Sequence, residues 1–429
     1  MSVSRYHDPL VDETVVRSTL PSGLEVVVIP RPGQRRTYAT FATYYGSIDS
    51  HFRVPTTGEP LEVPDGIAHF LEHKMFAKPE GDVMDQFAAL GASTNAYTEY
   101  LTTSYLFSTT DQVAECLAIL MDLVQRPHFT EENVQKEQGI IEQELRMYLD
   151  MPGDRVHSNL MRALYQKHPV RLDIGGSVDS IRTITPDVLY RCYETFYHPS
   201  NMQLLVVGDL DANQVMAQIA DAQREKGLTA SQGEIVRYLP DEPAAVAQDW
   251  VEQVMPVSLP LVAIGYKDPI QRLEGMDLLR REVVSDIMWG LLLGKASHLW
   301  SRLYAEGLIN DRFGAHYSAA PTYAYSSMGG ETPDPERLAE VLADELPRLE
   351  ITADDVERQK KSEWGGFATL FNSPGDLAYQ YNAWHFRGVD LFDYPQALEA
   401  VSLKDVQARR DEHVQSAHRS VSVIRPEAP

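Results

Sequence analysis

The chain has 429 residues, of which 43% are hydrophobic, so it is long enough for roughly two to four domains with sizeable cores. Its 62 acidic residues outnumber 38 basic ones, and the formal net charge of −24 argues against nucleic acid and anionic membranes as partners. Two cysteines are too few for a disulfide framework, no apolar run approaches the ~20 residues that span a bilayer, and no signal-peptide pattern opens the chain, so we expect a cytoplasmic protein.

The first half of the chain alternates predicted strands and long helices, as α+β domains do. Residues 15–20 and 24–29 read as a hairpin, and a strand over 37–46 is followed by a polar loop. That loop, over 47–64, leads to a helix that Asp65 can cap. The other predicted elements of this half are an extended segment over 96–108, helices over 111–125 and 131–149, and a strand over 204–207.

Residues 226–246 have the composition of a linker, because glycine and proline recur there with little hydrophobic periodicity. The motif Phe129-Thr130-Glu131-Glu132-Asn133-Val134, which precedes a long predicted helix, is echoed 222 residues later by Ile351-Thr352-Ala353-Asp354-Asp355-Val356. We therefore predict an internal duplication, with domains over 1–225 and 247–429 on either side of the linker.

The segment His69-Phe70-Leu71-Glu72-His73 carries the clearest chemical signal. A helix turns about 100° per residue, which places His69, Glu72 and His73 on one face and the apolar side chains on the opposite face. Two imidazoles at positions i and i+4 can share one metal ion. An HxxEH string is expected by chance only about 0.03 times in such a chain, and the alternative interpretation is two surface histidines flanking a solvated glutamate.

A third metal ligand is expected to be a carboxylate on an otherwise apolar surface. In the predicted helix over 131–149, Glu137 and Glu144 share a face with the apolar residues Val134, Ile140, Ile141, Leu145 and Tyr148. Burying an unpaired carboxylate costs several kcal/mol, so such groups usually face a cation or a hydrogen-bond donor. Two alternatives stay open: an apolar face misplaced by one residue, and a salt bridge to Arg146 or Arg155.

If His69, His73 and Glu144 bind a metal, two imidazoles favour one zinc ion per chain, although ligand type alone leaves Mn²⁺ and Co²⁺ open. Zinc would lower the pKa of a bound water molecule toward ~7. Glu72 is then the expected general base for attack of that water on a carbonyl.

These residues resemble the pitrilysin or insulinase family of zinc peptidases, whose signature is the HxxEH order. The same resemblance is carried by residues 20–24, 66–68, 91–96, 197–201 and 206–209, strongly over the first half of the chain and weakly over the second. It implies an α+β fold of two homologous α/β-roll domains, each an antiparallel sheet with helices packed on one face.

The resemblance also implies roles for individual residues. It makes His69, His73 and Glu144 the zinc ligands, Glu72 the base, and Glu137 the carboxylate behind the ligands.

The resemblance further implies that a peptide substrate is added as a strand along the sheet edge that follows the Gly-Ala-Ser-Thr-Asn-Ala stretch. Asn95 and Ala96 are therefore predicted substrate contacts, with a turn-forming asparagine as the alternative.

The second half lacks the metal-binding pattern, since Leu291, Gln359 and Gly366 stand 222 residues after His69, Glu137 and Glu144. Family members that form a closed chamber supply an arginine and a tyrosine from the metal-free side.

At the position expected for that tyrosine the chain has Asn310. We therefore predict a second homologous subunit, in a heterodimer or a homodimer, that supplies the pair. The alternative is that Arg312 or Tyr317 fills the role within the chain.

The leading hypothesis is a zinc metalloendopeptidase that cleaves peptides or unfolded segments in a two-subunit clamshell. The alternatives are a catalytically silent, partner-dependent binding or scaffold subunit of a processing complex, and a metallohydrolase acting on substrates other than peptides.

Overall fold

The computed structural model describes residues 2–228, 230, 232–269 and 272–427, and two residues of the predicted linker lie outside this part. The described chain forms two compact units. Unit 1 comprises residues 1–145, 173–239 and 368–386, and unit 2 comprises residues 146–172, 240–367 and 387–429. Each unit therefore contains one segment from the opposite half of the sequence.

Unit 1 is built on a seven-stranded sheet with the order β1-β2-β3-β11-β4-β10-β9, in which only β3 and β11 run parallel. Its strands are β1 (Ser2–Asp8), β2 (Glu13–Thr19), β3 (Glu25–Pro30), β4 (Thr37–Thr43), β9 (Ser93–Thr98), β10 (Thr103–Thr109) and β11 (Met202–Gly208). Its larger helices are α1 (Ile67–Phe76), α2 (Val83–Ala89), α3 (Val113–Gln125), most of α4 (Glu131–Leu149), α7 (Pro186–Phe196) and α8 (Ala212–Glu225).

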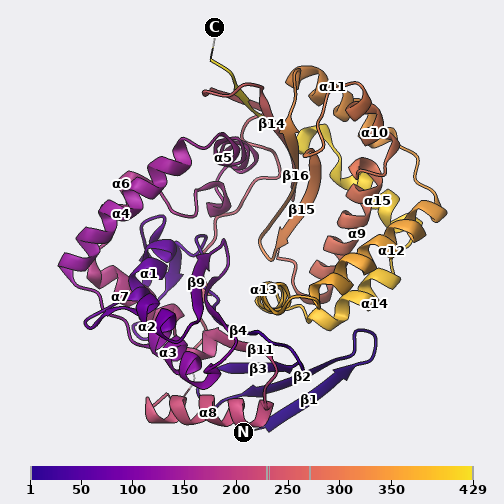
Figure 1. Ribbon diagram of the computed structural model, residues 1–429. Helices are drawn as coiled ribbons and strands as arrows, with labels where there is room; N and C mark the ends of the chain where they lie inside the picture. The colour runs from indigo at the N-terminus through magenta and orange to yellow at the C-terminus, as the bar shows by residue number, and fades with distance from the viewer. Residues whose placement is uncertain (1, 229, 231, 270–271, 428–429) are drawn as a thin grey trace. The chain divides into compact units, whose positions relative to one another are not determined.

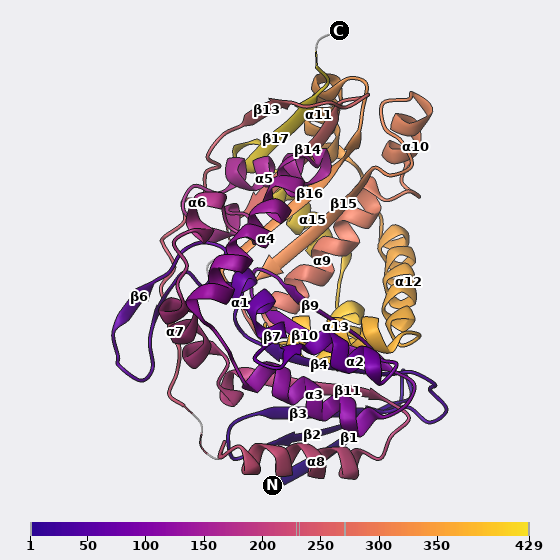
Figure 2. The same ribbon diagram turned by 60° about the vertical axis from the view of Figure 1, so that its left-hand side comes forward.

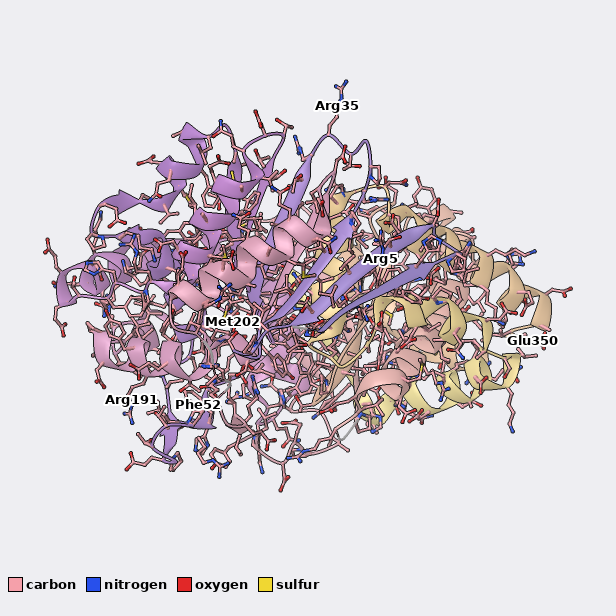
Figure 3. All side chains as sticks on the ribbon, turned by 90° about the horizontal axis from the view of Figure 1, so that it is seen from below. Arg5, Arg35, Phe52, Arg191, Met202 and Glu350 are labelled. Atoms are coloured by element: carbon pink, nitrogen blue, oxygen red, sulfur yellow. The ribbon has the colours of Figure 1, made fainter. Side chains whose placement is uncertain are left out.

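A smaller sheet, with the order β12-β5-β6, joins the predicted polar loop to the predicted linker. Its strands are β5 (His51–Arg53), β6 (Pro60–Glu62) and β12 (Val236–Arg237), so both segments contain short strands that the sequence did not predict. Figure 2 shows β6 on a hairpin that projects from the side of the unit. Arg35, on the loop between β3 and β4, points away from the ribbon into solvent (Figure 3).

Unit 2 has a five-stranded sheet with the order β13-β17-β14-β16-β15, in which only β13 and β17 run parallel. Its strands are β13 (Trp250–Val254), β14 (Leu261–Asp268), β15 (Gly314–Ala320), β16 (Tyr323–Glu331) and β17 (Arg419–Arg425). Its helices include α9 (Gly275–Leu293), α10 (His298–Ala305), α11 (Pro335–Glu345), most of α12 (Ala353–Leu370), α14 (Tyr394–Glu399) and α15 (Leu403–His413).

Two helices exchange places between the halves of the sequence. Helix α13 (Pro374–His385), from the second half, packs on β4 and β11 of unit 1, and α5 (Pro152–Leu164), from the first half, packs on β14 and β17 of unit 2. The colours of Figure 1 follow residue number. They show α13, from the C-terminal part of the chain, beside β4, and α5, from the N-terminal half, beside β14. Both helices begin with Pro-Gly-Asp, and 222 residues separate their starts, which repeats the offset found in the sequence.

Each exchanged helix covers the sheet face opposite to the other helices of its unit. Asn382 of α13 donates to Thr40 Oγ1, whereas the alternate residues Ala39 and Phe41 of β4 belong to the core beneath α1 and α3. The α+β fold with antiparallel-rich sheets is thus confirmed, and each sheet carries one additional helix on its second face.

Candidate metal and catalytic site

Helix α1 presents the HxxEH residues as the helical periodicity predicts. Phe70, Leu71 and Met75 are fully buried in the core of unit 1, while the side chains of His69 and His73 remain 15% and 25% exposed. The predicted cap is wrong, because α1 begins after Gly66, which has a φ of 88° and makes no side-chain capping bond. A Cβ at Gly66 would lie 2.2 Å from the carbonyl oxygen of Gly175, so glycine permits this close packing.

Helix α4 brings a carboxylate to both imidazoles. Oε1 of Glu144 lies 3.7 Å from Nε2 of His69, and Oε2 lies 3.5 Å from Nε2 of His73. One ligand atom from each of these three residues lies within 4.8 Å of the other two. Two ligands of a tetrahedral zinc ion are about 3.3–3.5 Å apart, so the group could hold such an ion with little rearrangement.

Glu137, about two helical turns before Glu144 on the same face of α4, lies behind His73. Its Oε1 is 3.2 Å from Nδ1 of His73, and its Oε2 accepts a hydrogen bond from Nζ of Lys74 at 3.2 Å. A carboxylate on the second ring nitrogen fixes the orientation of a metal-binding imidazole. Nδ1 of His69, in contrast, is buried and has no hydrogen-bond partner among the described atoms.

The pKa values of the two imidazoles are shifted in opposite directions. Burial, helped by the neighbouring His73, lowers the pKa of His69 to about 4, so its ring is neutral near pH 7, as a metal ligand must be. Burial also lowers the pKa of His73, but the hydrogen bond to Glu137 and the surrounding carboxylates outweigh it and raise that pKa overall. Burial opposes ionisation of Glu137, yet its bonds to His73 and Lys74 hold the pKa below its ordinary value.

Glu72 lies beside the metal-binding group and is only 8% exposed. Burial raises the pKa of Glu72. The hydrogen bond of 2.8 Å that Thr98 Oγ1 donates to Oε2 opposes this rise but does not outweigh it. Thr98 ends β9, which is an edge strand of the sheet, so one side chain connects the expected base to the sheet edge.

The predicted substrate contacts Asn95 and Ala96 also lie on β9, three and two residues before Thr98, respectively. Asn95 is exposed and Ala96 is partly buried, so the asparagine is part of the edge strand and does not form a turn. The structure therefore brings His69, Glu72, His73, Glu137 and Glu144 together and places Asn95 and Ala96 along the neighbouring edge.

Sequence reasoning missed two residues of this site, Lys74 and Thr98. Lys74 is 2% exposed, and the helical rotation that separates the faces of α1 places it among the apolar side chains, so a buried charge could have been predicted. Thr98 follows Ala96 at the two-residue period of a strand and therefore shares its face. The sequence analysis did not identify Thr98 because it predicted one extended segment over 96–108. The structure has two strands there, β9 and β10, and the chain reverses between them.

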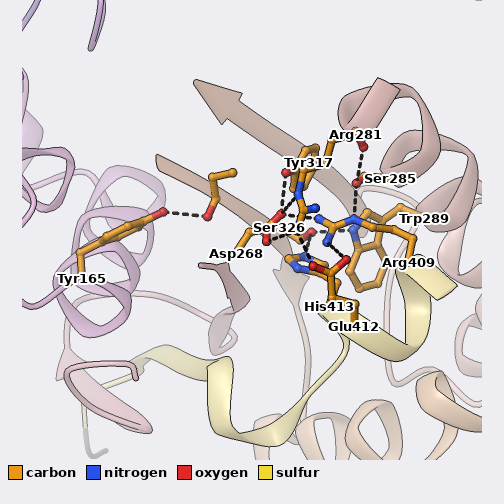
Figure 4. Close-up of polar contacts among 11 residues, drawn as sticks. Tyr165, Asp268, Arg281, Ser285, Trp289, Tyr317, Ser326, Arg409, Glu412 and His413 are labelled. Atoms are coloured by element: carbon orange, nitrogen blue, oxygen red, sulfur yellow. Dashed lines mark hydrogen bonds and ion pairs between the residues drawn. The ribbon is translucent and has the colours of Figure 1, made fainter. Parts of the chain in front are cut away.

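Asn310 and Tyr317, the two residues considered at the tyrosine position, have other contacts in unit 2. Asn310 donates to Glu331, and the Tyr317 hydroxyl donates to Asp268 at 2.7 Å. Figure 4 shows Tyr317 in a buried network where Arg281 and Arg409 also bind Asp268. Within the described parts of the chain, His69, His73 and Glu144 form the one group of histidine, cysteine and acidic residues that could hold a metal ion.

Two family profiles match successive parts of this chain. The profile described as insulinase, peptidase family M16, matches residues 57–177, and the profile described as the peptidase M16 inactive domain matches residues 183–363. An uncharacterized zinc protease of Bacillus subtilis, YmfH, is 40% identical over 420 residues, which cover 97% of this chain and 98% of the relative. None of the helices in the described residues has the length and hydropathy needed to cross a membrane.

Solved structures show the same fold. A structure described as an M16-like peptidase from Alicyclobacillus acidocaldarius superposes with a TM-score of 0.93 at 37% identity and covers 98% of this chain and 100% of that one. A protease from Helicobacter pylori superposes with a TM-score of 0.79 at 21% identity, over 96% and 99% of the two chains. From its sequence and fold, this chain belongs to the insulinase family of peptidases, family M16.

Proposed function

We propose that the chain is a zinc-dependent metalloendopeptidase that hydrolyses peptides or unfolded segments. The observation that carries the proposal is the convergence of His69 Nε2, His73 Nε2 and the Glu144 carboxylate within 4.8 Å, with Glu72 beside them. Zinc, when bound, supplies a Lewis acid that polarises a peptide carbonyl and makes a water molecule more acidic.

The residues of the chain have distinct parts in this proposal. His69, His73 and Glu144 hold the ion, and Glu137 fixes the ring of His73 through Nδ1. Glu72 accepts a proton from the attacking water at its carboxylate and later returns it to the departing amine. Thr98 donates a hydrogen bond to Oε2 of Glu72 and so helps to hold the carboxylate in its orientation.

We further propose that activity needs a second homologous subunit. Asn310 stands where the family's tyrosine is expected, and Tyr317 is committed to Asp268 inside unit 2. These observations also support the second candidate function, a partner-dependent binding subunit without turnover.

Homologous halves over 1–225 and 247–429, with the linker 226–246 between them, are part of the same proposal and rest on the 222-residue offset.

A cytoplasmic location is also proposed. Cys116 and Cys192 are both free and buried, as is usual in a reducing compartment. Cell fractionation with an antibody against the chain tests this, and recovery outside the cytoplasm would refute it.

The test of the proposed activity combines zinc analysis with hydrolysis of a quenched peptide library, with and without the candidate partner. About one zinc per chain is expected. Cleavage should fall by ~10²–10⁴-fold in Glu72→Gln, because the base is lost while the ligands stay. Glu142→Gln on α4 is the matched control and should keep both zinc and activity.

The other outcomes separate the alternatives. A zinc-free chain that never cleaves would favour the scaffold subunit. A chain that binds zinc but cleaves no peptide, even with its partner, would favour a hydrolase with another substrate class.

A further inference from the structure

The face of β9 that points away from Glu72 carries a second constellation of side chains. Because alternate residues of a strand point to opposite faces, Thr98 points to α1 while Tyr97 points to the other face of the sheet, and Glu99, the residue after β9, follows the same alternation. There they meet Tyr379 of α13. All three residues belong to unit 1.

The contacts of this group form a carboxylate flanked by aromatic rings. The rings of Tyr97 and Tyr379 are 5.7 Å apart at an angle of 53°, and the Tyr379 hydroxyl donates to Oε1 of Glu99. Thr102 Oγ1 donates to Oε2 of the same carboxylate at 3.4 Å. Tyr379 is 43% exposed, so solvent reaches the group.

Glu99 has no ion pair with another of the described residues. Its two donors are neutral hydroxyls, and no lysine, arginine or histidine of the described residues lies within 4.0 Å of it. Other carboxylates of this unit do have cations, such as Asp49 with Arg237 at 2.7 Å. A partly exposed carboxylate beside a pair of aromatic rings is suited to a cation, which can gain an ion pair and contact with a ring face.

We propose that Tyr97, Glu99 and Tyr379 form a subsite for a cationic side chain, arginine or lysine, of a peptide lying along β9. The inference rests on the proposed peptidase function and on the predicted addition of the substrate as a strand along the edge that contains Asn95 and Ala96. In an added strand, alternate side chains point to the two faces of the sheet. One set therefore points toward Glu72, and the residues between them point toward Glu99.

The contact between Tyr379 and Glu99 also has a purely structural interpretation, in which it holds α13 against β9. The two interpretations differ in their dependence on charge. Glu99→Gln keeps an acceptor for the Tyr379 hydroxyl and removes only the charge, so a structural bond largely survives the change while a cation subsite does not.

The test uses pairs of quenched peptides in which one arginine is replaced by citrulline, its uncharged counterpart, at each position around the scissile bond. In the zinc-loaded wild type, with partner if needed, we expect kcat/KM to favour arginine by about tenfold at one position. The preference should shrink at high salt, because a partly exposed ion pair is screened. Glu99→Gln should bring the ratio close to one, and the exposed Glu115→Gln on α3 should leave it unchanged.

Charge reversal provides the positive result that misfolding cannot mimic. Glu99→Lys should favour glutamate over glutamine at the position where the wild type favours arginine. Equal rates for arginine and citrulline peptides at every position in the wild type would overturn the subsite.

Failure of the proposed activity would be visible separately. Binding of the same peptide pairs to Glu72→Gln, measured by fluorescence anisotropy, reports the subsite without turnover. If no peptide is cleaved but arginine peptides bind about tenfold tighter than citrulline peptides, the subsite stands and the peptidase proposal fails. Equal binding of both peptides would refute the subsite whether or not cleavage occurs.

Discussion

The cluster around Glu144 in unit 1 and the cluster around Asp268 in unit 2 both contain buried charged side chains, and the two clusters balance their charges differently. In unit 1, the carboxylates of Glu72, Glu137 and Glu144 are close together, and Lys74 is the permanent cation bonded to one of them. In unit 2, Asp268 receives bonds from Arg281, Arg409 and Tyr317 and is 3% exposed.

The comparison shows what a functional site lacks and a structural one has. The network around Asp268 pairs its carboxylate with two guanidinium groups, so the charge of the carboxylate is compensated within unit 2 (Figure 4). The cluster around Glu144 has excess negative charge and two neighbouring imidazoles, so it could hold a cation. The predictions below test whether this difference is real.

The largest effect is expected from removing a ligand. His73→Ala and Glu144→Gln should lose more zinc affinity than the ~10–100-fold that removal of an outer partner costs. The melting temperature of the metal-free protein should not fall in Glu144→Gln, because one of three mutually repelling carboxylates is gone. Zinc analysis and calorimetry measure the two effects, and retention of zinc by both variants would remove the basis of the comparison.

Breaking the network of unit 2 should instead cost stability. Asp268→Asn leaves the buried guanidinium of Arg409 and the partly buried one of Arg281 without this carboxylate, so we expect a loss of ~3–5 kcal/mol in the free energy of unfolding and no change in zinc content. Urea titration measures the loss. Glu412→Gln is the control, since Glu412 is a mostly exposed partner of Arg281 and should contribute at most ~1 kcal/mol.

Glu137→Gln should weaken zinc binding by ~10–100-fold, because the amide orients His73 less firmly than a carboxylate does. Competition with a chelator measures the affinity. Glu132→Gln, in the exposed first turn of α4, should bind zinc as the wild type does. An unchanged affinity in Glu137→Gln would mean that the contact with His73 has no part in metal binding.

The smallest effect is a pH dependence. Burial raises the pKa of Asp268, but the bonds from Arg281 and Arg409 outweigh it and hold the pKa far below its ordinary value. The stability that this group contributes is present above the unfolded pKa of about 3.9 and is lost as the pH falls toward the folded value. The stability difference between wild type and Asp268→Asn should therefore narrow by ~1 kcal/mol between pH 5 and pH 3. A constant difference over this range would contradict the assignment.

The local parts of the structure were predictable from the sequence. The predicted helix over 131–149 coincides with α4, and the faces of α1 follow from a rotation of 100° per residue. What local patterns could not show is where a strand reverses, as it does between β9 and β10, and which residue enters a left-handed conformation, as Gly66 does. Ile140 lies on the apolar face of α4 by rotation yet is 47% exposed, because rotation does not specify what packs against a face.

The exchange of α5 and α13 could not be predicted from the sequence either. The hydrophobic pattern of a helix does not specify the sheet on which that helix packs. The exchange has a consequence for biosynthesis. Strand β11 completes the sheet of unit 1 at Gly208, but the helix that covers its second face ends at His385, 177 residues later. At ~5–20 residues per second, a ribosome needs roughly 10–35 s to make that stretch. During that time the nascent first half exposes a bare sheet face, so it would be a client for chaperones, and separate expression of residues 1–225 would yield an aggregation-prone fragment.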